Sequence, residues 1–165
     1  MRNSYFILRH GQTPYQLKKE KIIYPWPEKE PILLTKKGKK QIEKVAQSLK
    51  KEKIDLIFSS DRARARQTAE IVAQKLKISK VIFDSRLGDI NVGIFQGEPL
   101  SKYRSYFSSP KEWFLKAPPQ GESLKDVGDR MLRFLKDLER NHKYLKIGFL
   151  VLFVEPFILR KIFMR

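Results

Sequence analysis

The sequence predicts an α/β domain, a three-layer α/β/α sandwich with a mostly parallel central sheet. Short apolar runs of strand length alternate along the chain with segments that carry apolar residues at helical spacing. This alternation is typical of parallel sheets covered by helices on both faces. The chain has 165 residues, 41% of them hydrophobic, which is enough for one sizeable core, so we expect one domain over residues 1–165.

The sheet is expected from four apolar runs, at residues 5–8, 54–60, 80–84 and 147–154. Ligands of such sheets bind beyond the carboxyl ends of the strands. The first run ends at Arg9-His10-Gly11 and the second at "SSDRAR". Candidate functional residues therefore follow two of the predicted strands.

Helices are predicted between the strands. Ile42, Val45, Ala46 and Leu49 recur at i, i+3, i+4, i+7 and indicate a helix from Thr35 to Glu52. A second helix is expected over residues 61–76, with Ser59, Ser60 or Asp61 as its cap. The capping-box pair Ser123 and Asp126 opens a third, over residues 123–141. Proline-rich residues 12–34 and glycine-rich residues 86–97 are expected as loops, and residues 100–117 as irregular helix.

The formal net charge of +17 would attract nucleic acid, anionic membrane or small phosphorylated molecules. The lysines are scattered through amphipathic helices, so a solvated basic surface is expected and nucleic acid is not the expected partner. Charged residues interrupt the apolar run 147–163, which argues against a membrane span. The absence of cysteine excludes disulfides and cysteine nucleophiles, and the first apolar run is too short for a signal peptide. A cytoplasmic protein is expected.

The residues at the two strand ends suit phosphate chemistry. A neutral imidazole such as that of His10 can attack phosphorus once the phosphoryl charge is neutralised, and arginine can bind two phosphate oxygens at once. Helical geometry predicts Arg62 and Arg66 on one side and Arg64 on another, so at most one or two of the three can enter a shared pocket. The alternative is a structural histidine beside a solvated arginine face.

Five motifs in order resemble the histidine phosphatase superfamily, the phosphoglycerate-mutase-like proteins. "RHGQT" resembles R-H-G-[EQ]-T, "LTKKGKKQIEKVA" resembles L-T-x-x-G-x-x-Q-A, and "SSDRARARQTAEI" resembles S-S-x-L-x-R-A-x-Q-T-A. "LGDINVGIFQG" resembles L-x-E-x-x-x-G-x-x-x-G, and "PPQGESLKDVGDRM" resembles the G-G-E-S segment with its helix. The resemblance covers residues 4 to about 140.

The resemblance implies specific roles for residues of this chain. His10 is the nucleophile that forms a phosphohistidine, and Arg9 and Arg64 bind the phosphate. Asp89 stands where the family has a general acid, usually a glutamate. Gln16 stands where the phosphate pocket often has an asparagine. No metal ion or other cofactor is implied, because arginines and histidines stabilise the transferred group.

The resemblance fails at the last predicted strand, where the family has S-H-G. Phe153 occupies the position of the second catalytic histidine, and His142 precedes the strand and cannot replace it. Losing one such donor typically slows an enzyme by about a hundredfold to a thousandfold. Three explanations are open: a slow or degenerate enzyme, a fragment with a short C-terminal part, or a shifted reading frame near Tyr144, which is slightly favoured.

The expected function is hydrolysis of a small phosphomonoester by a metal-independent phosphohydrolase of the histidine acid phosphatase type. A phosphatase is preferred to a mutase because the segment between Gly97 and Gly121 is short. The alternatives are a catalytically silent phosphate-binding protein, a mutase-type phosphotransferase and a basic nucleic-acid-binding domain. The substrate and the oligomeric state stay open.

Overall fold

The computed structural model of the chain describes residues 2–150. Its sheet has four strands: β1 (Ser4–Leu8), β2 (Leu56–Ser59), β3 (Val81–Phe83) and β4 (Lys146–Leu150). Their order is β1-β4-β2-β3, and all three neighbouring pairs are parallel. The prediction of a mostly parallel sheet is confirmed.

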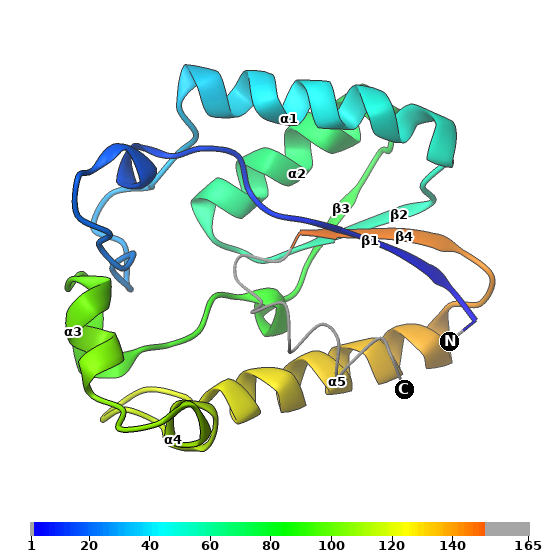
Figure 1. Cartoon of the computed structure of the whole chain (residues 1–165). Helices are drawn as coiled ribbons and strands as arrows, with labels where there is room; N and C mark the ends of the chain where they lie inside the picture. Colours follow the sequence, from blue (N-terminus) through cyan, green and yellow to red (C-terminus); the bar gives the residue numbers. More distant parts are fainter. Residues whose placement is uncertain (1, 151–165) are drawn as a thin grey trace.

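Helices cover the sheet from both sides, as the three-layer prediction requires (Figure 1). α1 (Lys36–Leu49) and α2 (Ala63–Leu76) lie on one face, and α5 (Leu124–Asn141) lies on the other. Each face has its own apolar core. Ile42 and Ala69 pack on one side of the sheet, and Met131 and Phe134 on the other, all nearly inaccessible to solvent.

The two most periodic helices form as predicted. The Thr35 hydroxyl accepts a hydrogen bond from the Gly38 amide and begins α1, and a 3₁₀ turn over Lys50–Glu52 continues it to the predicted end. In α5, Ser123 and Asp126 make both bonds of the capping box. Its apolar face is buried: Leu124, Val127, Met131, Phe134, Leu135 and Leu138.

The start of α2 differs from the prediction. Its N-cap residue is Arg62, whose side chain makes no capping hydrogen bond. Ser59 is still the last residue of β2, and the chain needs Ser60 and Asp61 to turn from the sheet into the helix. The expectation that one of these three residues caps the helix is therefore wrong, although the Ser60 hydroxyl accepts a hydrogen bond from the Arg62 amide at 3.3 Å.

The remaining elements are short and lie toward the carboxyl ends of the strands (Figure 1). α3 (Leu100–Ser105) and α4 (Pro110–Leu115) form the expected irregular helical segment. The predicted loops contain 3₁₀ turns at Pro14–Leu17, Ser85–Leu87 and Gly93–Phe95. These segments surround the sheet end where His10 and Arg64 were expected to meet.

β4 places its carboxyl end between those of two other strands. Leu150 is in register with Leu8 of β1 and Ser59 of β2. The strand prediction for residues 147–154 is confirmed as far as residue 150. Phe153 lies outside the described residues.

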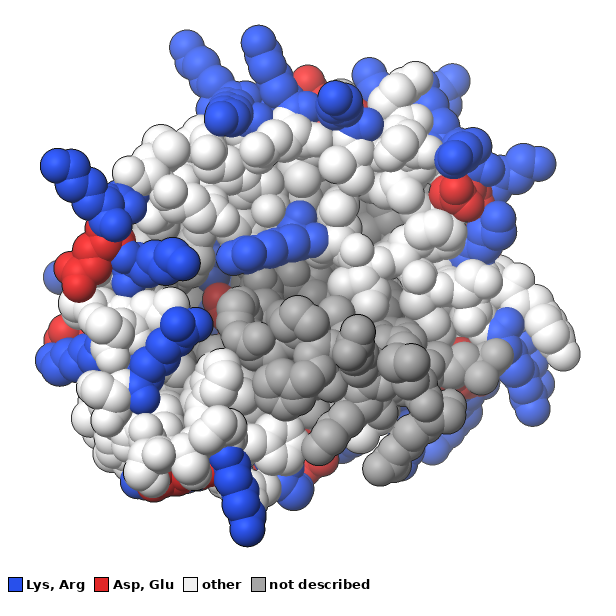
Figure 2. Space-filling view, in the orientation of Figure 1, with Lys and Arg blue, Asp and Glu red and all other residues white. Residues whose placement is uncertain are grey.

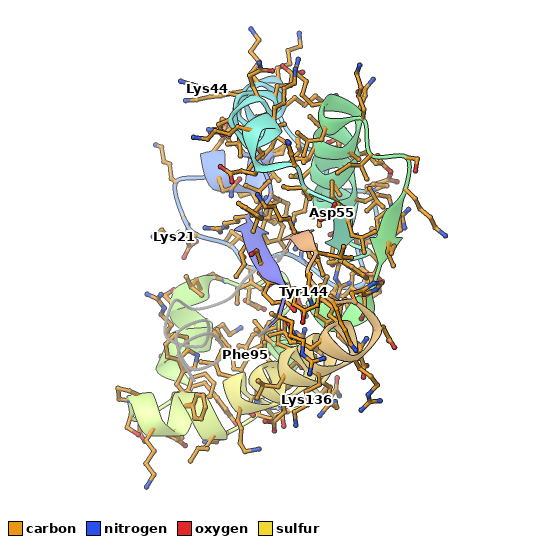
Figure 3. All side chains as sticks on the ribbon, turned by 90° about the vertical axis from the view of Figure 1, so that its right-hand side faces the viewer. Lys21, Lys44, Asp55, Phe95, Lys136 and Tyr144 are labelled. Atoms are coloured by element: carbon orange, nitrogen blue, oxygen red, sulfur yellow. The ribbon has the colours of Figure 1, made fainter. Side chains whose placement is uncertain are left out.

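Basic side chains are spread over the surface. Figure 2 shows Lys and Arg side chains dispersed over one face, several of them over α1, with acidic side chains between them. In Figure 3, Lys44 on α1 and Lys136 on α5 lie on opposite sides of the molecule. This distribution fits a solvated basic surface. Within residues 2–150, none of the helices combines the length and the apolar character needed to cross a bilayer.

Candidate active site

A cavity of about 520 Å³ lies beyond the carboxyl ends of β1 and β2. Its lining brings together all of the residues to which the sequence analysis gave a role in the site: Arg9, His10, Gln16, Arg64 and Asp89. They come from loops and from one helix that are far apart in the sequence. The geometry of each side chain decides what it can do there.

His10 is held in one tautomer. The residue is 6% exposed, and Nδ1 lies 2.7 Å from the carbonyl oxygen of Gly11. A carbonyl can only accept a hydrogen bond, so Nδ1 carries the proton and Nε2 keeps its lone pair. Nε2 is therefore the ring nitrogen that could act as a nucleophile.

The charge state of His10 agrees with that assignment. Burial, together with the positive charges of Arg64 and Arg9, lowers the pKa of His10 to about 4 against the opposing effect of the Gly11 hydrogen bond. The imidazole is thus neutral at neutral pH.

Thr68 joins the two motifs that form the site. Its hydroxyl donates to the carbonyl oxygen of Arg64 at 2.7 Å and accepts from the Gly11 amide at 3.3 Å. Gly11 also lies directly against α1, since a Cβ atom there would stand 2.6 Å from the Gly38 carbonyl oxygen. A glycine is required for this close approach, which fixes the position of His10 relative to both helices.

Arg64 lies in the first turn of α2 and is 1% exposed. Its Nη1 is 2.5 Å from Glu28 Oε1, and its Nη2 is 3.3 Å from Asp89 Oδ2. The guanidinium carbon lies 3.8 Å from the centre of the Tyr24 ring. Arg64 is therefore a buried cation that two carboxylates and an aromatic face surround.

The other two arginines of α2 do not follow the predicted grouping. Arg62 lines the cavity with its guanidinium carbon 2.9 Å from the centre of the Trp26 ring, whereas Arg66 lies over Phe83 on β3. Arg62 has an extended backbone, with ψ of 137°, because it is the N-cap residue. Helical spacing does not apply to it, so the expectation that it shares a side with Arg66 is wrong.

Asp89 has a raised pKa. Burial raises it and outweighs the lowering by the charge of Arg64 and by the hydrogen bond that the Ile90 amide donates to Oδ1. This environment favours the protonated carboxyl more than water does, which suits a proton donor.

Gln16 and Arg9 lie at the more open side of the cavity. Both side chains are exposed. Gln16 Oε1 accepts a hydrogen bond from the Thr13 amide at 2.6 Å and closes the 3₁₀ turn. The side-chain amide nitrogen of Gln16 is thus the donor that it can offer to an anion.

Comparison with known proteins agrees with the motifs. The family model of the histidine phosphatase superfamily (branch 1) matches residues 5–154. The chain belongs to the histidine phosphatase superfamily. Its fold class and its likeness to phosphoglycerate-mutase-like proteins, both expected from the sequence, are confirmed.

Curated relatives in this superfamily include phosphatases and mutases. "Fructose-2,6-bisphosphatase TIGAR" from Xenopus tropicalis is 36% identical over 138 residues, which are 81% of this chain and 49% of that protein. "Probable phosphoglycerate mutase GpmB" of Escherichia coli is 31% identical over 151 residues, 87% of this chain and 67% of that protein. The chain therefore spans about half the length of the fructose-2,6-bisphosphatase that it matches.

A solved histidine phosphatase also resembles this chain. The structure of a mycobacterial glucosyl-3-phosphoglycerate phosphatase with VO3 superposes with a TM-score of 0.72 at 25% identity, over 88% of this chain and 73% of that one. The fold is thus shared with an enzyme that is named a phosphatase.

One segment of the cavity lining carries no motif and was not expected from the sequence. Tyr24, Trp26 and Glu28 all line the cavity, and each contacts Arg62 or Arg64. A sequence signal exists, because these alternate residues share a side of an extended chain and two prolines separate them. The proline content identified only a loop.

His142 lies far from the site. It is the C-cap residue of α5, and its carbonyl oxygen accepts a hydrogen bond from Asn3, which precedes β1 at the amino end of the sheet. His10 follows the opposite end of the same strand. The prediction that His142 cannot replace a second catalytic histidine therefore agrees with its position.

The described part of the chain holds no cluster of three or more His, Cys, Asp or Glu residues that could bind a metal ion. The positive groups that line the cavity are instead guanidinium and ammonium groups, with Arg9, Arg62 and Arg64 nearest in sequence to the strand ends.

Proposed function

We propose that this histidine phosphatase hydrolyses a small phosphomonoester through a phosphohistidine on His10. The observation that carries the proposal is the hydrogen bond from His10 Nδ1 to the Gly11 carbonyl, because it leaves the Nε2 lone pair available in a neutral ring. The cavity has room for a phosphoryl group with a small organic part.

In the first step, Nε2 of His10 attacks phosphorus and the bond to the leaving oxygen breaks. Asp89, in its protonated form, gives its proton to that oxygen, and the product alcohol leaves. In the second step, water attacks the phosphohistidine, Asp89 takes the proton from the water, and the P–N bond breaks. Inorganic phosphate leaves and both side chains return to their initial states.

Arg9 and Arg64 neutralise the charge of the transferred group, and the amide nitrogen of Gln16 supplies a further donor. Guanidinium groups here take the role that metal ions have in many phosphoryl-transfer sites. No step of this scheme requires a metal ion or another cofactor.

The names of the relatives favour small phosphorylated metabolites as substrates. They include a sugar bisphosphatase, a phosphoglycerate mutase and a phosphatase of a glucosylated phosphoglycerate. We propose a small phosphomonoester as the substrate class of this chain, with hydrolysis in place of transfer to a second acceptor.

The test is release of inorganic phosphate from a chromogenic phosphomonoester by the protein and by His10→Ala. We expect turnover by the protein and a loss of at least about a thousandfold in the variant, as for removal of an enzyme nucleophile. Turnover that His10→Ala leaves unchanged would contradict the mechanism. Phosphate binding without any turnover would instead identify a catalytically silent phosphate-binding protein.

A further inference from the structure

The Arg64 guanidinium is closed off from solvent by its own partners. Its side chain is 2% exposed, Nη1 contacts Glu28 Oε1, Nη2 contacts Asp89 Oδ2, and Tyr24 covers one face of the group. Nε is buried and has no hydrogen-bond partner among the described residues. A phosphoryl group can reach this cation only if one of the two carboxylates moves away.

Glu28 is the stronger competitor for Arg64. Its contact with the guanidinium is 2.5 Å, against 3.3 Å for Asp89, and its side chain is only 7% exposed. Asp89 competes less strongly, because it lies farther from the guanidinium and burial disfavours its charged form. Glu28 therefore occupies the place that an anionic ligand needs.

We propose that Glu28 is a specificity-determining residue, whose carboxylate takes the place of the phosphoryl group on Arg64 until a ligand displaces it. A dianion gains more from the Arg64 charge than the Glu28 carboxylate does, whereas a monoanion gains about as much, so the site selects dianionic phosphomonoesters over monoanions such as phosphodiesters. The inference rests on the proposed phosphate-binding role of Arg64.

A movement of the Glu28 carboxylate involves the loop that carries it. Glu28 Oε2 accepts a hydrogen bond from the Ile32 amide at 3.1 Å, so a movement of the carboxylate involves residues 28–32 as well. The preceding part of the loop is attached to the protein, since the Ile23 amide donates to Glu98 and the Leu100 amide donates to Lys21. The exchange therefore concerns residues 24–32.

A different role for Glu28 makes the opposite prediction. If Glu28 served mainly to orient Arg64 for phosphate, its removal would weaken anion binding. The Tyr24 ring and Asp89 already hold the guanidinium from two other directions, and its Nε is an unused donor. We therefore expect removal of the Glu28 charge to strengthen anion binding, because Arg64 then keeps only the more distant carboxylate of Asp89 as a counter-ion.

The experiment is a calorimetric titration at alkaline pH with two ligands that are not turned over. Inorganic phosphate is then mainly a dianion, and dimethyl phosphate is a monoanion. Glu28→Gln is compared with the unaltered protein and with Glu30→Gln, which makes the same change in net charge at an exposed position of the same loop. We expect Glu28→Gln to bind phosphate about tenfold more tightly than the unaltered protein, a gain of about 1.4 kcal/mol in binding free energy. We also expect the ratio of its affinities for phosphate and dimethyl phosphate to be smaller than in the unaltered protein.

Unchanged or weaker phosphate binding by Glu28→Gln, or an equal gain by Glu30→Gln, would overturn the inference. If neither the protein nor Glu28→Gln binds phosphate, the proposed phosphate site itself is wrong. If Glu28→Gln does not fold, Glu28→Asp replaces it. Its shorter side chain keeps the charge but reaches Arg64 less well, so tighter phosphate binding supports the inference and unchanged binding overturns it.

Discussion

Asp89 Oδ2 lies 3.3 Å from Arg64 Nη2, yet the pKa of Asp89 is raised above the ordinary aspartate value. Burial opposes the charged form more strongly than the neighbouring guanidinium supports it. An incoming phosphoryl dianion would add a further negative charge and raise this pKa again. Because its pKa is raised, Asp89 keeps its proton to a higher pH than an exposed aspartate would.

The pH dependence of kcat/KM follows from two groups with opposite requirements. His10 must be neutral, so activity falls as the pH drops through its pKa of about 4. Asp89 must be protonated for the first step, so activity also falls as the pH rises through its raised pKa. We expect a bell-shaped profile with its acid limb near pH 4. Activity that rises steadily into the alkaline range would contradict these assignments.

Asp89→Asn tests the role of the general acid. We expect kcat/KM to fall by about 10²–10⁴ for an alkyl phosphate, whose leaving oxygen needs a proton, and by much less for a nitrophenyl phosphate, which leaves as a stable anion. The alkaline limb of the pH profile should disappear as well. An equal loss for both substrates would indicate that Asp89 acts only through the structure of the pocket.

Arg64→Lys tests the planar guanidinium at the buried position, and Arg66→Lys is the matched control on the same helix. Arg64 lines the cavity, whereas Arg66 lies over Phe83. Lysine keeps the charge but cannot bind two phosphate oxygens in one plane. We expect about a hundredfold lower kcat/KM for Arg64→Lys and no change for Arg66→Lys. Similar losses in both variants would argue against a specific role for Arg64.

Alanine substitutions at two helical glycines distinguish the effect of close packing on stability from the effect of helix propensity. Alanine favours a helix over glycine by about 1 kcal/mol. Gly128→Ala in α5 should therefore stabilise the protein by about that amount, because a Cβ atom there meets nothing within 4 Å. Gly38→Ala in α1 should destabilise it by about 1–3 kcal/mol, because its Cβ atom would lie 2.2 Å from the Gln12 carbonyl oxygen. Urea unfolding of both variants measures the difference, and a stabilised Gly38→Ala would contradict the packing of the His10 loop on α1.

The sequence predicts the parts of this molecule that have strong local signals. The apolar spacing of α1 and α5 and the Ser123–Asp126 capping box define helices on their own, without tertiary contacts. The position of His10 after β1 follows from the strand run alone. The start of α2 could not be predicted in this way. Three residues suited to an N-cap follow one another, and the path of the chain out of β2 decides where the helix begins.

The tertiary contacts of the site lie beyond sequence periodicity. Glu28 reaches Arg64 from 36 residues away along an irregular loop, and no spacing rule joins the two residues. The raised pKa of Asp89 likewise depends on burial that the surrounding loops create together. Motif resemblance identified five of the residues that line the cavity, but not Tyr24, Trp26 and Glu28, which contact Arg62 or Arg64.

The central claim is a covalent phosphohistidine on His10, and trapping it is the most direct test. The protein is mixed with a phosphomonoester, quenched under alkaline conditions that preserve phosphohistidine, and analysed by peptide mass spectrometry beside His10→Ala. We expect phosphate on the peptide that contains His10, lost on brief acid treatment and absent from the variant. Turnover with no phosphate on His10, or with phosphate on another residue, would contradict it.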